Sequence, residues 1–474
     1  MKAFKCPKCG GDVKYDIAKE SILCEYCGET INRDDYQRFL DDNGLYATTQ
    51  FTCPQCGGSV LSYDDTISTF CSYCGAPVVF DKRIVEDTKP GSIIPFSVSK
   101  NAANEIYSKK IKNAFFAPDW MDDAGGRRTV GIYMPYFVYG AHAGGHFTVK
   151  GEKRTNYGSY TQVNEYSVDF DLDAQYDGTR FDAARAFPDA MSESIDTYKT
   201  GKTVPFKTAY LAGYYADGGD VAEENYNWLV KELVCNDLRA DGMTTSDGIK
   251  LKTGKIESHI EFETEKTLFP VWLHTHRRNG RVCYSAINGQ TGDAAAEIPI
   301  DKWKYIKVSV IAAAIIAVIM NLFFTITPKT FLIVAEIILF LFGFMLRKLH
   351  GDVYVRENHM DDIGYTGIHK FRQRAKASGK ASGSTKSSPG ATAWSFEIPL
   401  SVRFAGWYKT LIGLAVFAAV LLSGTVLDVI YYAAAGISIA LAVWSAFDII
   451  KQQNLLASRD IPVFTLQRGG DGNG

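Results

Sequence analysis

The sequence predicts a multi-domain chain: two small cysteine-rich modules, then an α+β domain rich in antiparallel strands, then four transmembrane α-helices arranged as two hairpins. Three observations predict it. Eight of the ten cysteines lie within residues 1–80, alternating apolar and polar residues dominate the middle of the chain, and four long apolar stretches follow. Apolar residues make up 46% of the 474 and charged residues 22%, which excludes global disorder. The net charge of −2 gives no overall attraction to nucleic acid.

The cysteines form two copies of one unit. CPKCGGDVKYD (6–16) and CPQCGGSVLSYD (53–64) begin the copies, which are offset by 47 residues, and each copy closes with Cys-x-Tyr-Cys-Gly. Four thiolates can surround one Zn²⁺ tetrahedrally, and the glycine after the second cysteine of a pair permits the turn of positive φ that such a knuckle needs. We expect hairpin strands between the knuckles, 13–15 with 21–23 and 60–63 with 66–70, and hence two tandem zinc ribbons, each with four cysteine ligands.

Both ions are expected to be structural, because four cysteine ligands leave no open coordination position. Cross-braced ligation, disulfides and an iron–sulfur cluster are the alternatives. The first ten residues contain no apolar secretory segment, so we expect a reducing compartment, which favours metal over disulfides. The expected ligands are Cys6, Cys9, Cys24 and Cys27 for one ion and Cys53, Cys56, Cys71 and Cys74 for the other.

The charge of the cysteine-rich region disfavours nucleic acid as a partner. Residues 1–80 contain seven Lys or Arg and eleven Asp or Glu. Each zinc with four thiolates adds two further negative charges, whereas a phosphate backbone is bound by a basic surface. The segment RDDYQRFLDDNG (33–44) carries an apolar stripe, which suits contact with a protein.

The middle of the chain, residues 93–303, is expected to be a cytosolic α+β domain behind a linker at 81–92. Ser99 can cap a helix over 100–114, and a second helix is expected after Asp220 with an apolar face of Tyr226, Leu229, Leu233 and Val234. The alternating segments predict strands at 129–142, 162–178, 257–266 and 269–289, the last with an Asn-Gly turn at 279–280.

The domain shows no catalytic signature: no phosphate-binding glycine loop, nucleophile elbow or His-Glu-x-x-His. We therefore expect no enzyme activity. Two histidine pairs, His142 with His146 and His274 with His276, have spacings that allow a second metal site. Local hydrogen bonding is the commoner role of histidines on strands and is the preferred interpretation.

Four apolar stretches predict membrane helices at 308–326, 330–346, 411–427 and 429–447. They define one hairpin at 304–348 and another at 407–450. Lys and Arg are concentrated outside the two hairpin turns, which places the N-terminus, the loop 349–406 and the tail 451–474 in the cytosol. The Gly/Ser/Lys tract 375–392 within the loop is expected to be disordered.

Glu336 is the ionisable residue within the second apolar stretch, and such a residue is a functional candidate. The preferred alternative is structural: a bond to Asn321 or to the end of a neighbouring helix, or extension of its side chain towards Lys329.

The order of the motifs resembles a known family. The double CPxCGG…CxYCG unit, YMPYFVYG (133–140), FPVWLHTH (269–276) and INGQTGDAAAEIPI (287–300) are similar to bacterial membrane proteins with a TFIIB-type double zinc ribbon, often labelled zinc-ribbon or primosomal-type proteins. The resemblance covers residues 1–346. It implies an envelope-stress setting, with phage-shock-protein-A-like or SPFH-domain proteins as cytosolic partners.

Together these observations predict a multi-pass scaffold of the cytoplasmic membrane that recruits soluble proteins to the lipid bilayer. The alternatives are a membrane-tethered nucleic-acid-binding regulator and a membrane enzyme or transporter subunit centred on Glu336.

Overall fold

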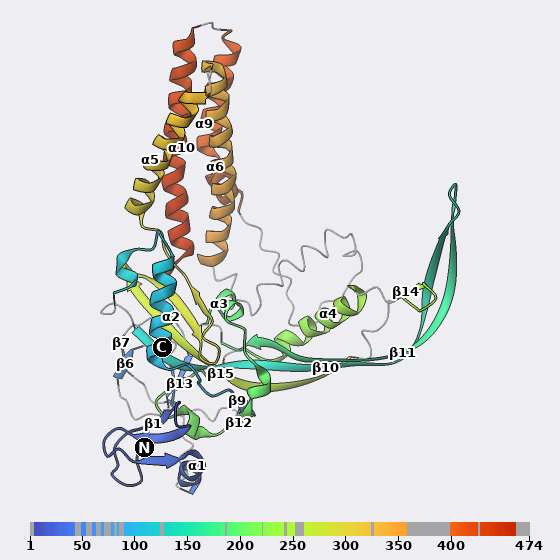
Figure 1. Cartoon of the computed structure of the whole chain (residues 1–474), viewed down its shortest axis with the longest axis vertical. Helices are drawn as coiled ribbons and strands as arrows, with labels where there is room; N and C mark the ends of the chain where they lie inside the picture. The colour runs from blue at the N-terminus through green and yellow to red at the C-terminus, as the bar shows by residue number, and fades with distance from the viewer. Residues whose placement is uncertain are drawn as a thin grey trace, which may run out of the picture.

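The computed structural model describes residues 4–42, 49–53, 59–62, 68–70, 77–79, 83–84, 90–123, 128–184, 187–219, 221–240, 244–251, 260–323, 327–357, 399–424 and 427–460. It has three parts, which we call the cysteine unit (residues 4–42), the sheet domain and the helical region (Figure 1). The helices stand at one end of the sheet domain and the cysteine unit lies at the other.

The cysteine unit is a three-stranded antiparallel sheet followed by a helix. Its strands are β1 (Val13–Asp16), β2 (Ser21–Cys24) and β3 (Thr30–Asn32). The expected hairpin is confirmed, since Val13 pairs with Cys24 and Asp16 with Ser21. Helix α1 (Arg33–Asp42) begins where the Asn32 side chain accepts the amide of Asp34 at 2.8 Å, which caps the first turn. Tyr36 and Leu40, one turn apart on α1, are buried against the sheet.

An antiparallel-rich sheet of 13 strands forms the sheet domain, as expected from the alternating segments. Four long strands build it: β10 (Arg128–Asn156), β11 (Thr161–Asp182), β15 (Ile260–Arg278) and β16 (Arg281–Asn288). The Asn-Gly turn between β15 and β16 is confirmed: Asn279 has φ +52° and Gly280 φ +73°, the left-handed conformation that a two-residue hairpin turn needs.

Short strands complete the sheet in the order β12-β9-β15-β10-β13-β5-β4-β8, with β11 and β14 added to β10, β16 to β15, and β17 and β18 to β16. A separate pair is formed by β6 and β7. The short strands are β4 (Thr49–Thr52), β5 (Ser59–Ser62), β6 (Ser68–Phe70), β7 (Pro77–Val79), β8 (Arg83–Ile84), β9 (Ser92–Ile93), β12 (Val204–Pro205), β13 (Tyr215–Ala216), β14 (Lys250–Leu251), β17 (Ala294–Ala296) and β18 (Arg459–Asp460).

The second cysteine copy does not repeat the strand pairing of the first, so the expected hairpin of 60–63 with 66–70 is wrong. Strand β5 pairs with β4 on one side and with β13 on the other, through Ala216 and Leu61. Both edges of β5 are therefore occupied, and β6 pairs with β7 instead. The second copy thereby extends the main sheet.

Helices cover the sheet at a few places. Ser99 accepts the amide of Ala102 and begins α2 (Lys100–Asn113), as the sequence predicts. Helix α4 (Glu224–Ala240) buries Tyr226, Leu229 and Val234 against β10 and β11. The shorter helices are η1 (Asp119–Met121), α3 (Asp189–Ser194), η2 (Thr200–Lys202) and η3 (Thr208–Leu211).

Beyond the sheet, β10 and β11 continue as a long curved two-stranded arm, seen at the right of Figure 1. Strand β10 is paired with β15 only as far as its residue Ala143. It stays paired with β11 as far as Asn156.

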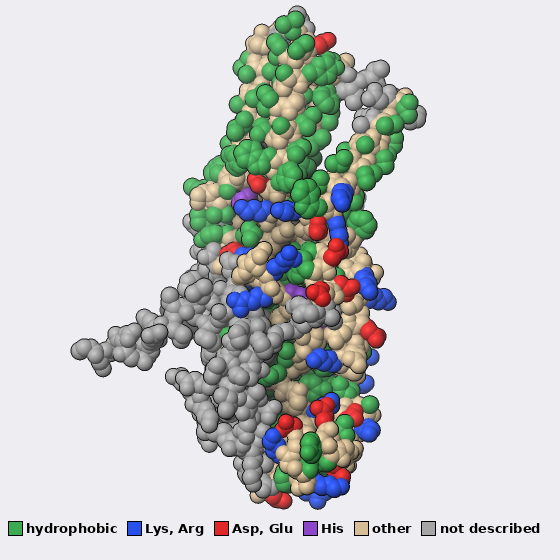
Figure 2. All heavy atoms as spheres, turned by 90° about the vertical axis from the view of Figure 1, so that its left-hand side faces the viewer, with side chains coloured by type: hydrophobic (Ala, Val, Ile, Leu, Met, Phe, Trp, Pro, Cys, Tyr) green, Lys and Arg blue, Asp and Glu red, His purple; other side chains and the backbone are tan. Residues whose placement is uncertain are grey.

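The helical region contains α5 (Lys302–Phe323), α6 (Pro328–Glu357), α8 (Leu400–Ala405), α9 (Tyr408–Leu422) and α10 (Asp428–Leu456). Helices α6 and α10 run parallel, both ending at the sheet domain, and α9 packs antiparallel against both; we call these three the helix bundle. Helix α5 leans away from the bundle in Figures 1 and 2.

The predicted four transmembrane helices in two hairpins are wrong in number. Among the residues that the structure describes, two helices are long and apolar enough to cross a membrane, α6 and α10. Helix α9 ends at Leu422, five residues before the apolar stretch does, and is about 22 Å long. Helix α5 ends at Phe323 and carries three lysines in its first turns, so residues 308–323 provide about 24 Å, less than a bilayer core of about 30 Å.

Candidate metal centre

Four cysteines of the cysteine unit come together in space. The Sγ atoms of Cys6, Cys9, Cys24 and Cys27 all lie within 4.8 Å of one another. Cys6 Sγ is 3.8 Å from Cys27 Sγ, and Cys9 Sγ is 3.6 Å from Cys24 Sγ. Two of the thiols are buried and two are exposed. This group is the one set of His, Cys, Asp and Glu side chains able to hold a metal ion among the residues that the structure describes.

Two equivalent turns position the thiols. The amide of Gly10 donates to the carbonyl of Cys6 at 2.8 Å, and the amide of Gly28 donates to the carbonyl of Cys24 at 2.9 Å. The two glycines have φ of +74° and +72°. The expectation that the glycine after a cysteine pair adopts positive φ is therefore confirmed for the first copy, and a side chain there would strain the turn that aims both sulfurs inward.

Backbone amides around the sulfurs favour the thiolate form at one position. The amides of Cys27 and Tyr26 donate to the sulfur of Cys24 and lower its pKa to about 7. The Gly11 amide, whose N lies 3.4 Å from Cys9 Sγ, likewise lowers the pKa of Cys9, but desolvation and the three neighbouring thiols outweigh it and raise that pKa to about 12. Four thiolates cannot gather here without a cation, so the donor set fits a thiophilic metal ion.

The cysteine unit packs directly on the sheet domain. The ring of Tyr15 meets the ring of Tyr210 edge-on at 5.3 Å, and the guanidinium of Arg33 lies over the same ring at 5.1 Å. Lys207 Nζ is 2.6 Å from Asp34 Oδ1, and the Tyr15 amide donates to the carbonyl of Ala212. The two parts share one apolar core, so the centre has a fixed position relative to the sheet.

The second expected ligand set is described only in part. Cys53 is buried in an apolar cluster of the sheet domain. Cys56, Cys71 and Cys74 lie outside the described residues, as does the tract 375–392.

The structure does not bring the two histidine pairs together. His142 lies just before the arm, opposite Glu261 of β15, and His146 lies on the arm; they bond exposed aspartates of β11 at 2.9 and 2.8 Å. His274 and His276 are buried beside Tyr107, whose hydroxyl lies 2.9 Å from His276 Nε2. His274 Nε2 lies 3.2 Å from Asn104 Oδ1. Each histidine thus has a hydrogen-bonding partner within the chain.

Glu336 lies inside the helix bundle. Its side chain is buried, and its Oε1 accepts the hydroxyl of Ser438 from α10. The carboxyl group reaches Gly413 of α9, where an added Cβ would lie 3.1 Å from Oε2. The bonding partner is thus the middle of a neighbouring helix and not the helix end that the sequence had suggested; Asn321 lies among the side chains that are not described.

A second polar contact in the bundle was not predicted from the sequence. Lys409 of α9 is 1% exposed, and its Nζ lies 2.5 Å from Asp448 Oδ2 of α10 and 4.2 Å from the ring centre of Trp444. Both charges stand at the ends of apolar stretches, where they look like ordinary flanking residues. Only the antiparallel packing of α9 on α10 shows that they meet.

The helix ends are bonded to the sheet domain by a network of charged side chains, which we call the junction. Arg281 of β16 donates to Glu357 Oε1 at 2.6 Å and to the carbonyls of Leu455 and Ser458, at 3.0 and 2.8 Å, at the end of α10. Arg356 donates to Glu297 at 2.9 Å. In the sequence, basic residues near the helices indicated only the orientation of those helices in a membrane.

Glu336→Gln is expected to leave the stability of the bundle within about 0.5 kcal/mol, because the amide keeps the shape and can still accept the Ser438 hydroxyl. Glu336→Ala should cost about 2 kcal/mol, since it removes the acceptor and leaves a cavity. SDS titration of the purified chain, followed by far-UV circular dichroism, measures both, with exposed Ile337→Ala as control. Equal losses for Gln and Ala would show that the carboxylate itself holds the helices together.

A comparison with known proteins finds a relative in Bacillus subtilis. The chain is 30% identical over 316 residues to "Uncharacterized protein YdjG" of Bacillus subtilis (strain 168), a match that covers 64% of this chain and 91% of YdjG. No family model matches the sequence, and no solved structure matches it.

Proposed function

The chain belongs to the same protein family as YdjG of Bacillus subtilis, and we propose that it is a membrane-anchored scaffold whose metal centre supports a docking module for soluble proteins. One observation carries the anchor: the helix bundle is apolar on its outside, while polar and charged side chains are buried among the apolar ones inside. The docking module is the cysteine unit at the end of the sheet domain opposite the helices, and its metal centre stabilises it.

The outer surface of the bundle is far more apolar than that of a soluble protein. Large apolar side chains of α6 such as Ile337, Leu341 and Phe344 are exposed, whereas Glu336 and Lys409 are buried. A core helix of a soluble protein is mostly enclosed, but only 33% of the apolar window is buried in each of α6 and α10. This arrangement favours a lipid environment, in which polar groups hold helices together from within.

The anchor is proposed to lie in the cytoplasmic membrane with the sheet domain in the cytosol. Figure 2 shows hydrophobic side chains over the helices and Lys and Arg gathered where the helices meet the sheet domain. Arg347 and Lys348 of α6 and Lys307 of α5 are exposed there. Basic residues flank membrane helices on the cytoplasmic side, where the reducing conditions also keep thiols available for metal.

We propose Zn²⁺ as the ion of the cysteine centre, in a structural role. Four sulfurs complete a tetrahedron and leave no position for substrate or water. We also propose a second structural Zn²⁺, bound by the cysteines of the second copy.

The cysteine unit is the proposed docking module. It lies at the end of the sheet domain opposite the helices, where a soluble protein can reach it (Figure 1). Residues 4–42 carry six basic and nine acidic side chains, so the surface suits a protein better than a nucleic acid. The resemblance in the sequence points to a phage-shock-protein-A-like or SPFH-domain protein as the companion.

Cross-linking in intact cells tests the proposal with point variants rather than a deletion, because the second cysteine copy contributes strands to the main sheet. The wild-type chain should remain in carbonate-washed membranes, and lysines of the cysteine unit should cross-link to a soluble companion. Cys24→Ser should keep the chain in the membrane and abolish those cross-links. The control Cys235→Ser replaces a buried cysteine of α4 and should retain them.

Two results would count against this function separately. If a carbonate wash extracts the chain from the membranes, the chain has no membrane anchor. Cross-links that persist in Cys24→Ser, or that fall on the arm instead, show that the metal centre does not support the docking surface.

A further inference from the structure

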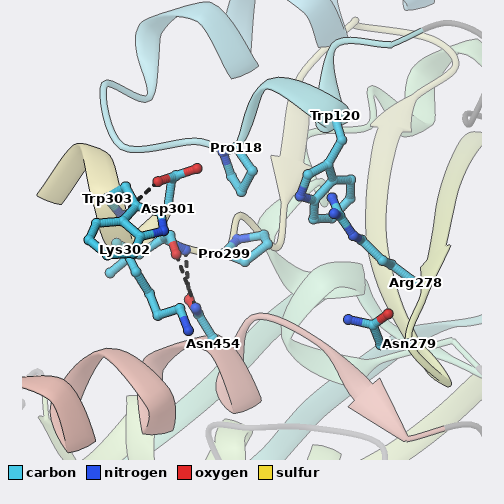
Figure 3. Close-up of a pocket in the computed structure, with 10 residues that line it drawn as sticks. Pro118, Trp120, Arg278, Asn279, Pro299, Asp301, Lys302, Trp303 and Asn454 are labelled. Atoms are coloured by element: carbon cyan, nitrogen blue, oxygen red, sulfur yellow. Dashed lines mark hydrogen bonds between the residues drawn. The ribbon is translucent and has the colours of Figure 1, made fainter.

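A cavity of about 330 Å³ lies where the sheet domain meets the start of α5 and the last turns of α10. We call it the junction pocket. Figure 3 shows Arg278 lying along the ring of Trp120 on one side of it, and Lys302 with Trp303 on the other. Its walls come from four parts of the chain: the segment at η1, the β15–β16 turn, the segment entering α5, and Asn454 of α10.

Two cations line the pocket without a carboxylate partner among the described residues. The Arg278 guanidinium stacks over the Trp120 ring at 5.1 Å from its centre, which orients the group and leaves its edge open. The Lys302 side chain makes no hydrogen bond or ion pair with the part of the chain that the structure describes. The next lysine, Lys304, differs, because its Nζ lies 2.5 Å from Asp119 Oδ1.

The carboxylate in the wall, Asp301, is already engaged. Its Oδ1 accepts the amides of Trp303 at 2.8 Å and Lys304 at 3.0 Å, which caps the first turn of α5. That capping bond offsets part of its charge, so the positive charges of Arg278 and Lys302 face the cavity without an anion of their own.

The pocket lies at the level where the anchor enters the bilayer. Asn454 of α10 forms two hydrogen bonds with the backbone of Ile300, at 2.7 and 3.0 Å, and so fixes the pocket against the end of α10. Asn454 is about 10 Å along the helix axis beyond Phe447, the last large apolar side chain of α10 that is exposed. Trp303 and Phe115 are each 70% exposed nearby, as aromatic side chains are at a membrane interface.

We propose that the junction pocket binds the phosphate of an anionic phospholipid headgroup. The inference rests on the proposed membrane location. A guanidinium and an ammonium group give charge-assisted hydrogen bonds to phosphate oxygens, the volume accommodates a phosphate with its glycerol, and the exposed aromatic rings lie at headgroup depth. A free phosphate ester shares this chemistry, and the experiment separates the two sources.

Native mass spectrometry of the full chain in mild detergent, titrated with phosphatidylglycerol, measures the affinity. The variant R278Q/K302Q removes both pocket cations. The matched control R277Q/K307Q removes the same two charges from neighbouring exposed positions outside the pocket. Loss of each charge-assisted hydrogen bond to the phosphate should weaken binding about tenfold, so the pocket variant should bind about 100-fold more weakly, whereas the control, whose charges lie outside the pocket, should bind much as the wild type does.

Several outcomes overturn the inference. Equal weakening in both double variants means general attraction of lipid to a basic surface. Glycerol phosphate that displaces the lipid at equal concentration means a soluble ligand. If R278Q/K302Q does not fold, the wild-type chain alone decides, because equal binding of phosphatidylglycerol and phosphatidylcholine also overturns the proposal. All of these results concern the pocket in a membrane-bound chain, whereas a chain absent from membranes would refute the proposed function itself.

Discussion

Replacing Cys24 with serine is expected to release the metal of the cysteine unit and to unfold residues 4–42, while the sheet domain stays folded. A unit of this size buries too little apolar surface to fold alone, and binding of a structural Zn²⁺ supplies an apparent free energy of about 10 kcal/mol or more. Serine cannot replace the thiolate. Elemental analysis of the purified chain measures the metal, and limited proteolysis within residues 4–42 measures the unfolding.

The same experiment distinguishes independent from shared metal sites. If each cysteine copy binds its own ion, Cys24→Ser loses one equivalent of metal and keeps the other. Loss of both would favour cross-braced ligation. Cys283→Ser provides the control, since this buried thiol lies on β16, away from the cluster, and its removal should change no metal content. A variant with full metal content and a protected cysteine unit would contradict the proposed centre.

Replacing Arg281 with alanine is expected to loosen the junction by about 3 kcal/mol. Arg281 is largely buried, and besides Glu357 and two backbone carbonyls its Nε donates to Ser458 Oγ at 2.7 Å. Its loss removes one donor from the partly buried Glu357 and from the carbonyls at the end of α10, and polar groups that lose a donor inside a protein are costly. Hydrogen exchange of the amides at 455–460 should accelerate about 100-fold, which corresponds to that free energy.

Arg277→Ala is the matched control, because Arg277 is exposed on the neighbouring strand β15, opposite Val282, and contributes no bond to the junction. It should leave exchange at 455–460 unchanged. If Arg281→Ala behaves like Arg277→Ala, the helix ends are held by packing alone, and the charged network contributes little.

Local sequence signals predicted local structure well. The glycines of the two knuckles, the Asn-Gly turn at 279–280 and the Ser99 cap each act through backbone conformations or bonds within four residues, and the structure confirms them. The ligand set of the first copy followed from the same local geometry. A signal of this kind needs no knowledge of the rest of the chain.

Contacts between distant segments could not be predicted in the same way. Lys409 and Asp448 meet only through helix packing, and Arg281 reaches Glu357 and Ser458 across long stretches of sequence. The second cysteine copy shows the same limit, since β5 pairs with β13, which lies far along the chain. Helix lengths were also misjudged, because the apolar stretches continue past the residues where α5 and α9 end.

The pairing of β18 with β16 has a consequence for biosynthesis. Arg281 and Val282 of β16 pair with Asp460 and Arg459, which follow α10 in the sequence. The ribosome therefore releases this last strand only after every helix has been translated, and until then that edge of the sheet stays open and prone to wrong pairing. Closure of this edge therefore comes after synthesis of α10, so a chain that ends before Arg459 leaves β16 unpaired there.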